Sequence, residues 1–281
     1  MFKKANKKQS KLRFAIFGAS GSGKTYSALR IANGMGFKIA VIDTERGSAS
    51  KYADRFDFDV AELPSPKIEN YVSFINAAKN YDVLIIDSLT HAWQELLSEI
   101  DETARIKYRG NSWSAWSEAT PKHKRLIEAV LNFDGHIIAT MRSKTEWTVE
   151  KDEKTGKNKP VRIGTVPEQG KGIEYEFDML MDINVKHCAR ILKDRTGKYQ
   201  DKTIDKPDEN LGVSLIEWLN EGENLLETLI SRLRTLSKGD KDKERKLLLD
   251  CTKGKSVDIE NLKTLSNKQI TFLLSRLPQT L

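Results

Sequence analysis

The chain of 281 residues contains 38% hydrophobic and 31% charged residues and has a formal net charge of +7. This length exceeds that of small disulfide scaffolds, and no apolar run approaches the roughly 20 residues that cross a bilayer. Cys188 and Cys251 lie far apart, and the four histidines are scattered without metal-ligand spacing, so the sequence predicts no zinc site and is compatible with the reducing cytoplasm.

The predicted elements begin after a basic tail, residues 1–11, which is either solvated or in contact with phosphates. Residues 12–18 predict a buried strand, and 24–33 predict a helix that is stopped by Gly34 and Gly36. The further expected elements are strand 37–43, helix 68–79, strand 83–87, helix 126–131, strand 136–141, strands near 176–184 and 189–193, and helices 223–236 and 270–277.

Near-continuous apolar strands separated by helices predict an α/β fold with a mainly parallel sheet, helices on both faces and antiparallel strands toward the C-terminal side. Residues 150–160 are polar and predict an exposed, mobile loop or hairpin tip. The composition changes after Trp218. We therefore expect a core over 12–218 and a small helical region over 219–281, whose last helix follows a Ser266–Gln269 capping box.

A phosphate-binding motif, Gly18–Thr25, matches GxxxxGK[ST] between the first expected strand and helix. Its glycines allow backbone N–H groups to face phosphates, Lys24 would reach the β and γ oxygens of ATP, and Thr25 would ligate Mg²⁺. The expected nucleotide-binding residues are Gly18, Ser20, Gly21, Ser22, Gly23, Lys24, Thr25 and Tyr26.

Two acidic residues follow other apolar runs. Asp87 ends the run 83–87 and is expected to share the metal with Thr25; it could equally be the N-cap of a helix that starts near Leu89, and both roles are compatible. Glu45 follows the strand 37–43 and is expected to orient or deprotonate the attacking water, the alternative being an ordinary surface charge.

These three motifs, in this order, are similar to the RecA/Rad-type recombinase core over residues 12 to 200. The resemblance implies a RecA-like P-loop ATPase that hydrolyses the β–γ phosphoanhydride with ATP and Mg²⁺. More narrowly, the segments 136–147 and 172–178 resemble the phage nucleotide-binding proteins, a group that includes single-strand-annealing proteins. Membership would imply single-stranded DNA as a partner, a role in recombination or annealing, a homo-oligomer with ATP sites at subunit interfaces, a single-strand-binding protein as a further partner, and the host-cell cytoplasm.

One departure concerns the end of the strand 136–141, where recombinases usually carry Asn-Gln and this chain has Met141-Arg142. Arg142 and Lys144 lie where a phosphate sensor would, and a plain surface role is as well supported. Residues 189–197 resemble the segment that hexameric RecA-fold motors project into a neighbour's ATP. Because alternate residues of an extended segment point the same way, Lys193 and Arg195 could face one γ-phosphate; the alternative is an exposed basic hairpin.

Two stretches combine cations with aromatic residues, a combination that suits sequence-tolerant binding of single strands. In the RecA-like resemblance both would be loops facing the DNA. Trp113 and Trp116 could instead anchor a helix to the core, and acidic residues dilute the second stretch. The first, 103–117, contains Arg105, Lys107, Tyr108, Arg109, Trp113 and Trp116, and the second, 142–172, contains Arg142, Lys144, Trp147, Lys151, Lys154, Lys157, Lys159, Arg162 and Lys171.

Two other functional classes compete with a DNA-binding ATPase. The chain could be an ATP-dependent assembly module that recruits a DNA-binding partner without binding DNA itself. It could also be a small-molecule P-loop kinase, although it lacks a compact arginine-rich lid and its Ile-Asp-Thr-Glu strand end is unexpected for one.

Overall fold

The computed structural model describes residues 11–36, 38–151, 158–220, 225–252, 262, 265 and 267–278. Most of the basic tail, the residues 152–157 of the expected mobile loop, and Ser266 of the expected capping box lie outside these ranges. Among the helices of the described part, none combines the length and apolar character needed to span a membrane.

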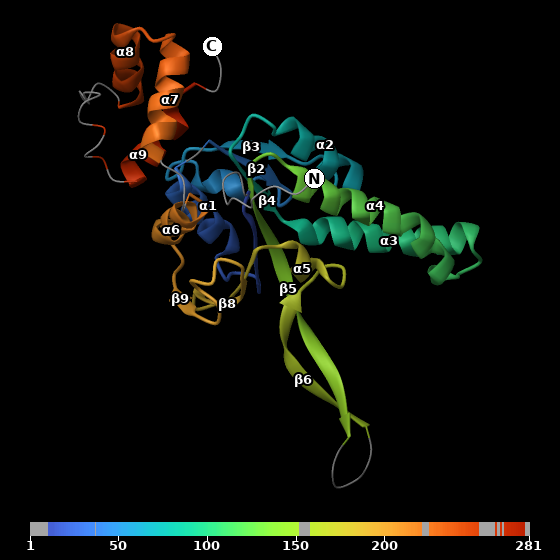
Figure 1. Cartoon of the computed structure of the whole chain (residues 1–281). Helices are drawn as coiled ribbons and strands as arrows, with labels where there is room; N and C mark the ends of the chain where they lie inside the picture. Colours follow the sequence, from blue (N-terminus) through green and yellow to red (C-terminus); the bar gives the residue numbers. More distant parts are fainter. Residues whose placement is uncertain are drawn as a thin grey trace, which may run out of the picture.

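A nine-stranded sheet forms the centre, in the order β3-β2-β4-β5-β1-β7-β8-β9, with β6 paired to β5 (Figure 1). The first six strands of this order are parallel, whereas β8, β9 and β6 pair antiparallel. The strands are β1 Arg13–Gly18, β2 Ile39–Asp43, β3 Asp59–Glu62, β4 Val83–Asp87, β5 His136–Lys151, β6 Asn158–Pro167, β7 Met179–Ile183, β8 Cys188–Asp194 and β9 Thr203–Asp205.

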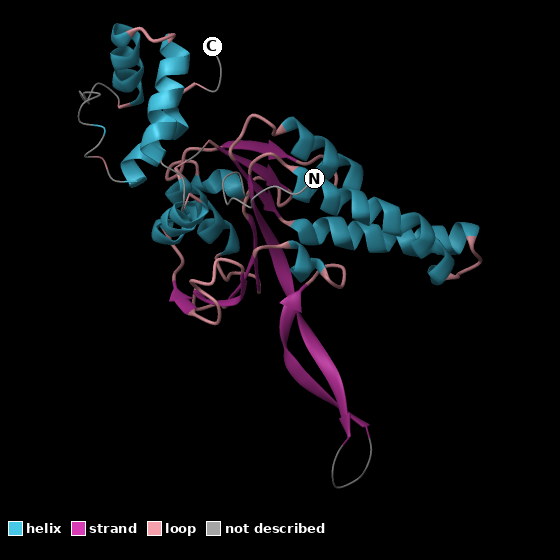
Figure 2. Ribbon diagram, in the orientation of Figure 1, coloured by secondary structure: helices cyan, strands magenta, loops and turns pink. Residues whose placement is uncertain are grey.

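Helices cover both faces of the sheet, as Figure 2 shows. One face packs against α2, α3 and α4, and the other against α1, the short helix η1 and α6. The helices are α1 Lys24–Met35, η1 Ala49–Tyr52, α2 Ile68–Ala77, α3 Leu89–Lys107, α4 Ser112–Asn132, α5 Ile173–Glu176, α6 Glu209–Leu219, α7 Leu225–Ser237, α8 Lys241–Cys251 and α9 Asn267–Arg276. The expected fold class, an α/β fold with a mainly parallel sheet, helices on both faces and antiparallel strands toward the C-terminal side, is confirmed.

Strand β1 is buried along its whole length because it lies between β5 and β7 with helices on either side. Its one charged residue, Arg13, is 6% exposed and donates to the carbonyl oxygens of Leu131, Phe133 and Gly135. These carbonyls lie at and just beyond the end of α4, where a cation is favourable. Arg13 therefore joins the start of β1 to the end of α4.

Two arms project from the sheet (Figure 1). The first is the antiparallel pair α3 and α4, joined at residues 108–111, so the expected DNA loop at 103–117 is mostly helix. Pro121 lies inside α4, and the Trp116 carbonyl one turn before it accepts from the Thr120 hydroxyl at 2.8 Å. The short helix expected at 126–131 is wrong in extent, because α4 runs from Ser112 to Asn132 and tolerates Pro121 in its interior.

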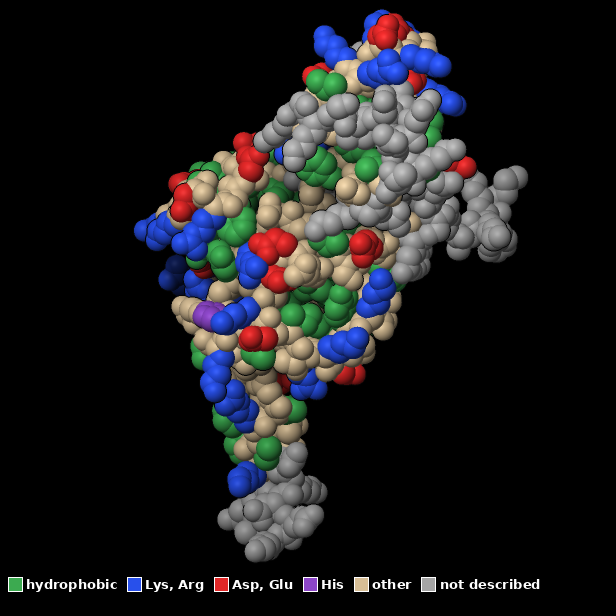
Figure 3. Space-filling model, turned by 90° about the vertical axis from the view of Figure 1, so that its left-hand side faces the viewer, with side chains coloured by type: hydrophobic (Ala, Val, Ile, Leu, Met, Phe, Trp, Pro, Cys, Tyr) green, Lys and Arg blue, Asp and Glu red, His purple; other side chains and the backbone are tan. Residues whose placement is uncertain are grey.

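The second arm is the ribbon of β5 and β6, paired from Ser143–Pro167 to Lys151–Asn158 with a bulge at Glu146/Trp147. The strand expected to end at Met141 thus continues ten residues further. Lys and Arg side chains lie along this ribbon together with hydrophobic ones (Figure 3). Trp147, Val149 and Ile163 are each at least 60% exposed, so the ribbon is not covered by the rest of the described chain.

The C-terminal helices α7, α8 and α9 bury a cluster of their own, which includes Leu229, Leu233, Leu248 and Leu273. The sequence predicted α7 and the region of α9, whereas the charged stretch that contains α8 was not recognised as a helix. Helix α6, also missed, packs on α1. The division of the chain at residue 218 remains a prediction.

Candidate functional site

The loop that follows β1 has the shape of an anion cradle. Gly21 and Gly23 adopt positive φ angles of 75° and 86°, which favour glycine. A Cβ on Gly18 would lie 2.2 Å from the carbonyl oxygen of Ile183, so only glycine fits there. Helix α1 begins at Lys24, and its first N–H groups point toward the loop, as phosphate binding at a helix N-terminus requires.

Lys24 lies over this loop. Its ammonium Nζ donates to the carbonyl oxygens of Gly18 at 3.1 Å and Ala19 at 2.9 Å. Burial lowers the pKa of Lys24, and the nearby carboxylates of Asp87 and Glu45 oppose that change. A desolvated cation at this position suits an incoming polyphosphate.

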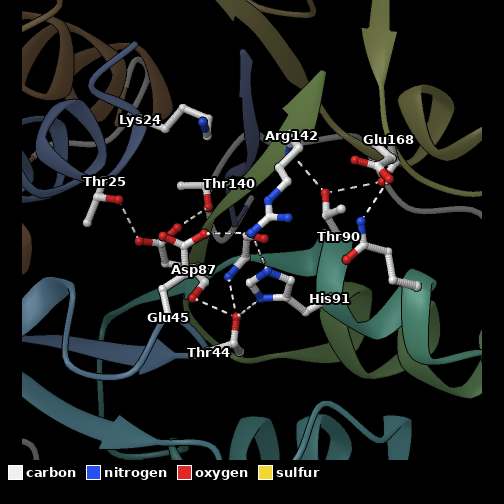
Figure 4. A network of polar contacts seen from close by, with 12 residues as sticks. Lys24, Thr25, Thr44, Glu45, Asp87, Thr90, His91, Thr140, Arg142 and Glu168 are labelled. Atoms are coloured by element: carbon white, nitrogen blue, oxygen red, sulfur yellow. Dashed lines mark hydrogen bonds and ion pairs between the residues drawn. The ribbon is translucent and has the colours of Figure 1, made fainter. Parts of the chain in front are cut away.

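Asp87 meets Thr25 at the carboxyl edge of the sheet (Figure 4). The Thr25 hydroxyl donates to Asp87 Oδ2 at 2.6 Å, and the Thr140 hydroxyl of β5 donates to Oδ1. Burial raises the pKa of Asp87, an effect that the two hydroxyl donors partly offset. The N-cap position of α3 is taken by Ser88, so the alternative reading of Asp87 as the N-cap is wrong.

This pair fits Mg²⁺ held between protein and nucleotide. Within the described residues no group of three or more His, Cys, Asp or Glu side chains is placed to hold a metal. Magnesium bound with a nucleotide takes few protein ligands, commonly one or two oxygens besides phosphates and water. Thr25 Oγ1 and Asp87 Oδ2 are oxygen donors beside the phosphate cradle, so they suit that role.

Asp43 and Glu45 lie two residues apart at the end of β2, but their side chains have different roles. Both carboxylate oxygens of Asp43 accept backbone N–H groups, from Glu45 at 2.6 Å and from Ala49 at 2.9 Å, so Asp43 shapes the turn. The Glu45 side chain points to the phosphate edge, where its Oε1 lies 3.5 Å from Arg142 Nη2. The structure therefore brings Arg142 into the same site as Glu45.

Thr44 and His91, which sequence patterns did not indicate, complete this part of the site (Figure 4). His91 Nδ1 lies 2.6 Å from Thr44 Oγ1, and its Nε2 lies 2.8 Å from Arg142 Nη2. The sequence held one usable signal: His91 lies in the first turn of the helix that follows the strand ending at Asp87, and therefore close to the edge where that strand ends.

The base of the ribbon is bonded to the start of α3. Thr90 Oγ1 accepts the N–H of Arg142 at 2.9 Å and donates to the Glu168 carbonyl at 3.1 Å. Gln169, 2% exposed, donates to the Leu89 carbonyl at 3.0 Å. Arg142 of β5 and the two residues that follow β6 therefore contact the helix that follows Asp87.

A cavity of about 1450 Å³ extends along this edge. Of the predicted nucleotide-binding residues, Ser22 alone does not line it; its side chain is buried and its hydroxyl has no hydrogen-bond partner among the residues that the structure describes. Tyr26 lines the cavity and also packs against Tyr52 and Phe56, with ring centroids 5.4 and 5.6 Å apart. His187 contacts the cradle from the turn between β7 and β8, with its Nδ1 3.0 Å from the carbonyl oxygen of Ser22.

Lys193 and Arg195 lie elsewhere. The register of β7 and β8 places Asp194 beside Met179, and therefore at the edge where β1 begins, opposite the phosphate cradle. Both side chains do point the same way, since Lys193 Nζ and Arg195 Nη2 donate to the Tyr175 carbonyl at 3.0 and 3.2 Å. The structure thus keeps them away from the chain's own cradle, and their action on a neighbour stays a prediction.

The two tryptophans of the first arm differ from each other. Trp116 packs against the core, with its ring centroid 5.8 Å from that of Trp93. Trp113 is 85% exposed. Among the cations of this arm, Lys107 pairs with Glu118 at 2.8 Å, whereas Arg105 and Arg109 are exposed.

The chain is similar to a known protein family and to solved structures. Residues 10–204 match a family model described as an AAA domain. A search of curated proteins finds no match. The RadB recombinase structure is 17% identical, with a TM-score of 0.39 and coverage of 69% of this chain and 88% of that one. A KaiC-like protein from the hyperthermophilic archaeon Pyrococcus horikoshii is 15% identical, with a TM-score of 0.38 and coverage of 68% and 82%.

Proposed function

Because the chain belongs to the AAA domain family, we propose that it is a Mg²⁺-dependent ATPase that binds single-stranded DNA as a homo-oligomer and acts in phage-type recombination or single-strand annealing. The observation that carries the ATPase part is the contact of Thr25 with Asp87, 2.6 Å, beside the glycine cradle and Lys24. These are the parts that a P-loop needs for a triphosphate and its metal.

In this proposal each residue has a defined task. Lys24 leaves the carbonyls of its own loop to neutralise the β and γ oxygens, while Thr25 and Asp87 hold the metal. When bound by Thr25 and Asp87, Mg²⁺ would supply charge neutralisation for the phosphates. Glu45 accepts a proton from water as the water oxygen attacks the γ-phosphorus, and the bond to the bridging oxygen breaks to give ADP and phosphate.

Two features support single-stranded DNA as the partner. Trp113 and Trp147 are exposed at 85% and 61%, one on each projecting arm, and exposed aromatic rings stack bases without sequence preference. Arg105 and Arg109 on the first arm and Arg162, paired with Trp147 on the second, are also exposed and could track a phosphate backbone. Trp116 is not part of this surface, because it packs on the core.

The position of Lys193 and Arg195 supports ATP sites shared between subunits. A cation at the edge opposite its own cradle can reach a cradle only in a neighbour, in a head-to-tail arrangement. Arg195 is bonded to Asp178 at 2.9 Å and its side chain is 57% exposed, so it is accessible to a second copy.

The test is ATP hydrolysis with and without single-stranded DNA, at about 50 and about 200 mM salt. We expect hydrolysis that DNA stimulates, with stimulation and DNA affinity both weaker at the higher salt. Lys24→Ala is expected to abolish turnover, and full activity in that variant would reject the site. Hydrolysis without any DNA affinity would instead favour an assembly module, and phosphate transfer to a metabolite would favour a kinase.

A further inference from the structure

Thr44, His91 and Arg142 form a continuous chain of polar contacts, hydrogen bonds followed by one ion pair, between the end of β4 and the carboxylate of Glu45. The Asp87 carbonyl is its first member, because it lies 3.0 Å from Thr44 Oγ1. The imidazole of His91 then bridges Thr44 Oγ1, at 2.6 Å, to Arg142 Nη2, at 2.8 Å. Arg142 ends the chain 3.5 Å from Glu45 Oε1.

The donors and acceptors fix the direction of every bond in this chain. A guanidinium has only donors, so His91 Nε2 must accept from Arg142 through its lone pair. The proton of a neutral imidazole then lies on Nδ1, which donates to Thr44 Oγ1. Thr44 Oγ1 also accepts the N–H of Ser88 at 2.9 Å and gives its own proton to the Asp87 carbonyl. No other tautomer avoids placing two N–H groups face to face.

We propose that His91 is a positioning residue for hydrolysis, which as the neutral Nδ1–H tautomer fixes the Arg142 guanidinium beside Glu45 and the site of the γ-phosphate. The inference rests on the proposed function. Burial, with the adjacent Arg142, lowers the pKa of His91, which favours the neutral form. The charged groups that face His91 are Arg142 from β5, Asp43 and Glu45 at the end of β2, and Glu168 after β6.

His91 does not touch the phosphates in this scheme, so it acts through Arg142. If its imidazole is removed, the guanidinium keeps its contact with Glu45 but loses the bond that sets its orientation. The effect should therefore appear in the rate of the chemical step more than in nucleotide affinity.

A double-mutant cycle tests this with the full chain, by measuring kcat for ATP hydrolysis and the Kd of ATP. We expect His91→Ala to lower kcat about 10-fold and to change Kd by less than about 3-fold. In the Arg142→Ala background the same change should alter kcat by less than about 2-fold, because its target is gone. Equal losses in both backgrounds would overturn the inference and leave His91 a structural residue.

Two further variants guard against misfolding. His91→Gln can still accept from Arg142 through its side-chain carbonyl, and we expect its kcat within about 3-fold of the wild type. His123→Ala removes another partly buried imidazole, one that neighbours Gln169 rather than Arg142, and we expect unchanged kcat. A loss of kcat in His91→Gln as large as that in His91→Ala would contradict the inference. The melting temperature of each variant is recorded to show that it is folded. Wild-type protein that hydrolyses no ATP would overturn the proposed function and this inference with it, whereas active wild type with additive losses overturns this inference alone.

Discussion

The hydroxyl of Thr25 donates to the carboxylate of Asp87 across 2.6 Å, although the two residues are 62 positions apart in the chain. This contact joins the first turn of α1 to the end of β4. In the sheet, β5 lies between β4 and β1, the strand that precedes α1. Asp87 is 1% exposed, so its charge is held in the protein interior until a cation meets it.

We therefore expect Asp87→Asn to stabilise the nucleotide-free protein while it abolishes hydrolysis. Burial raises the pKa of Asp87 in the folded state, so the ionised form opposes folding above the unfolded pKa. The melting temperature at pH 7 should rise by about 2–4 °C, and the gain should vanish below about pH 4, where both states are protonated. Calorimetry checks this, with the more exposed Glu45→Gln as a control; a lower melting temperature for Asp87→Asn would contradict it.

Arg195→Ala tests the shared site. The variant should lose ATP hydrolysis while it still binds ATP, because its own cradle is intact. Mixed with Lys24→Ala, it should regain roughly a quarter of wild-type activity, since some interfaces then combine an intact cradle with an intact arginine. Arg190→Ala, which removes an exposed cation from β8, the strand that ends just before Arg195, serves as the control. Mixtures as inactive as the separate variants would exclude the trans role.

The pair Trp113 and Trp116 separates DNA binding from packing. Trp113→Ala should weaken single-stranded DNA binding by about 1–3 kcal/mol and leave the melting temperature unchanged. Trp116→Ala should destabilise the fold by about 2 kcal/mol or more, because its ring packs on Trp93 and the core. Fluorescence titration and thermal melts measure the two effects, and equal loss of DNA affinity in both variants would count against a stacking role for Trp113.

Gly34 tests the packing of α1 on α6. A Cβ at this position would lie 2.0 Å from the carbonyl oxygen of Glu209, so Gly34→Ala should cost about 1–3 kcal/mol even though alanine favours helices. A Cβ on Gly36 would meet open space, but the φ of this residue is 74°, a left-handed conformation that alanine rarely adopts. Gly36→Ala should therefore lower the free energy of unfolding by about 1 kcal/mol. Urea denaturation compares the two, and a Gly34→Ala protein as stable as wild type would argue against this contact.

Gly34 also shows where sequence patterns reached their limit. It was expected to stop the helix, whereas α1 runs on to Met35 and the glycine permits the approach of α6. Local signals identified the cradle and the strand ends at Asp43 and Asp87, because glycine spacing and apolar runs act within a few residues. The extension of β5 and the role of α6 depend on partners far along the chain, and no local pattern encodes them.

The same distinction holds for the candidate site. Lys24, Thr25, Glu45 and Asp87 each belong to a recognisable motif, and the structure brings them to one edge. His91 could not be distinguished from the other histidines, because its role arises from the meeting of α3 with the ends of β2 and β5.

Arg142 is the last residue of β5 paired with β1, and the ribbon begins at the next residue. At about 3.4 Å per residue, the ribbon carries its far end on the order of 30 Å from that point. The residue that contacts Glu45 is thus also the residue from which the ribbon departs. A change in backbone direction at Arg142 would displace the distal end of the ribbon further than its base, so the position of that end depends on the geometry beside the phosphate cradle.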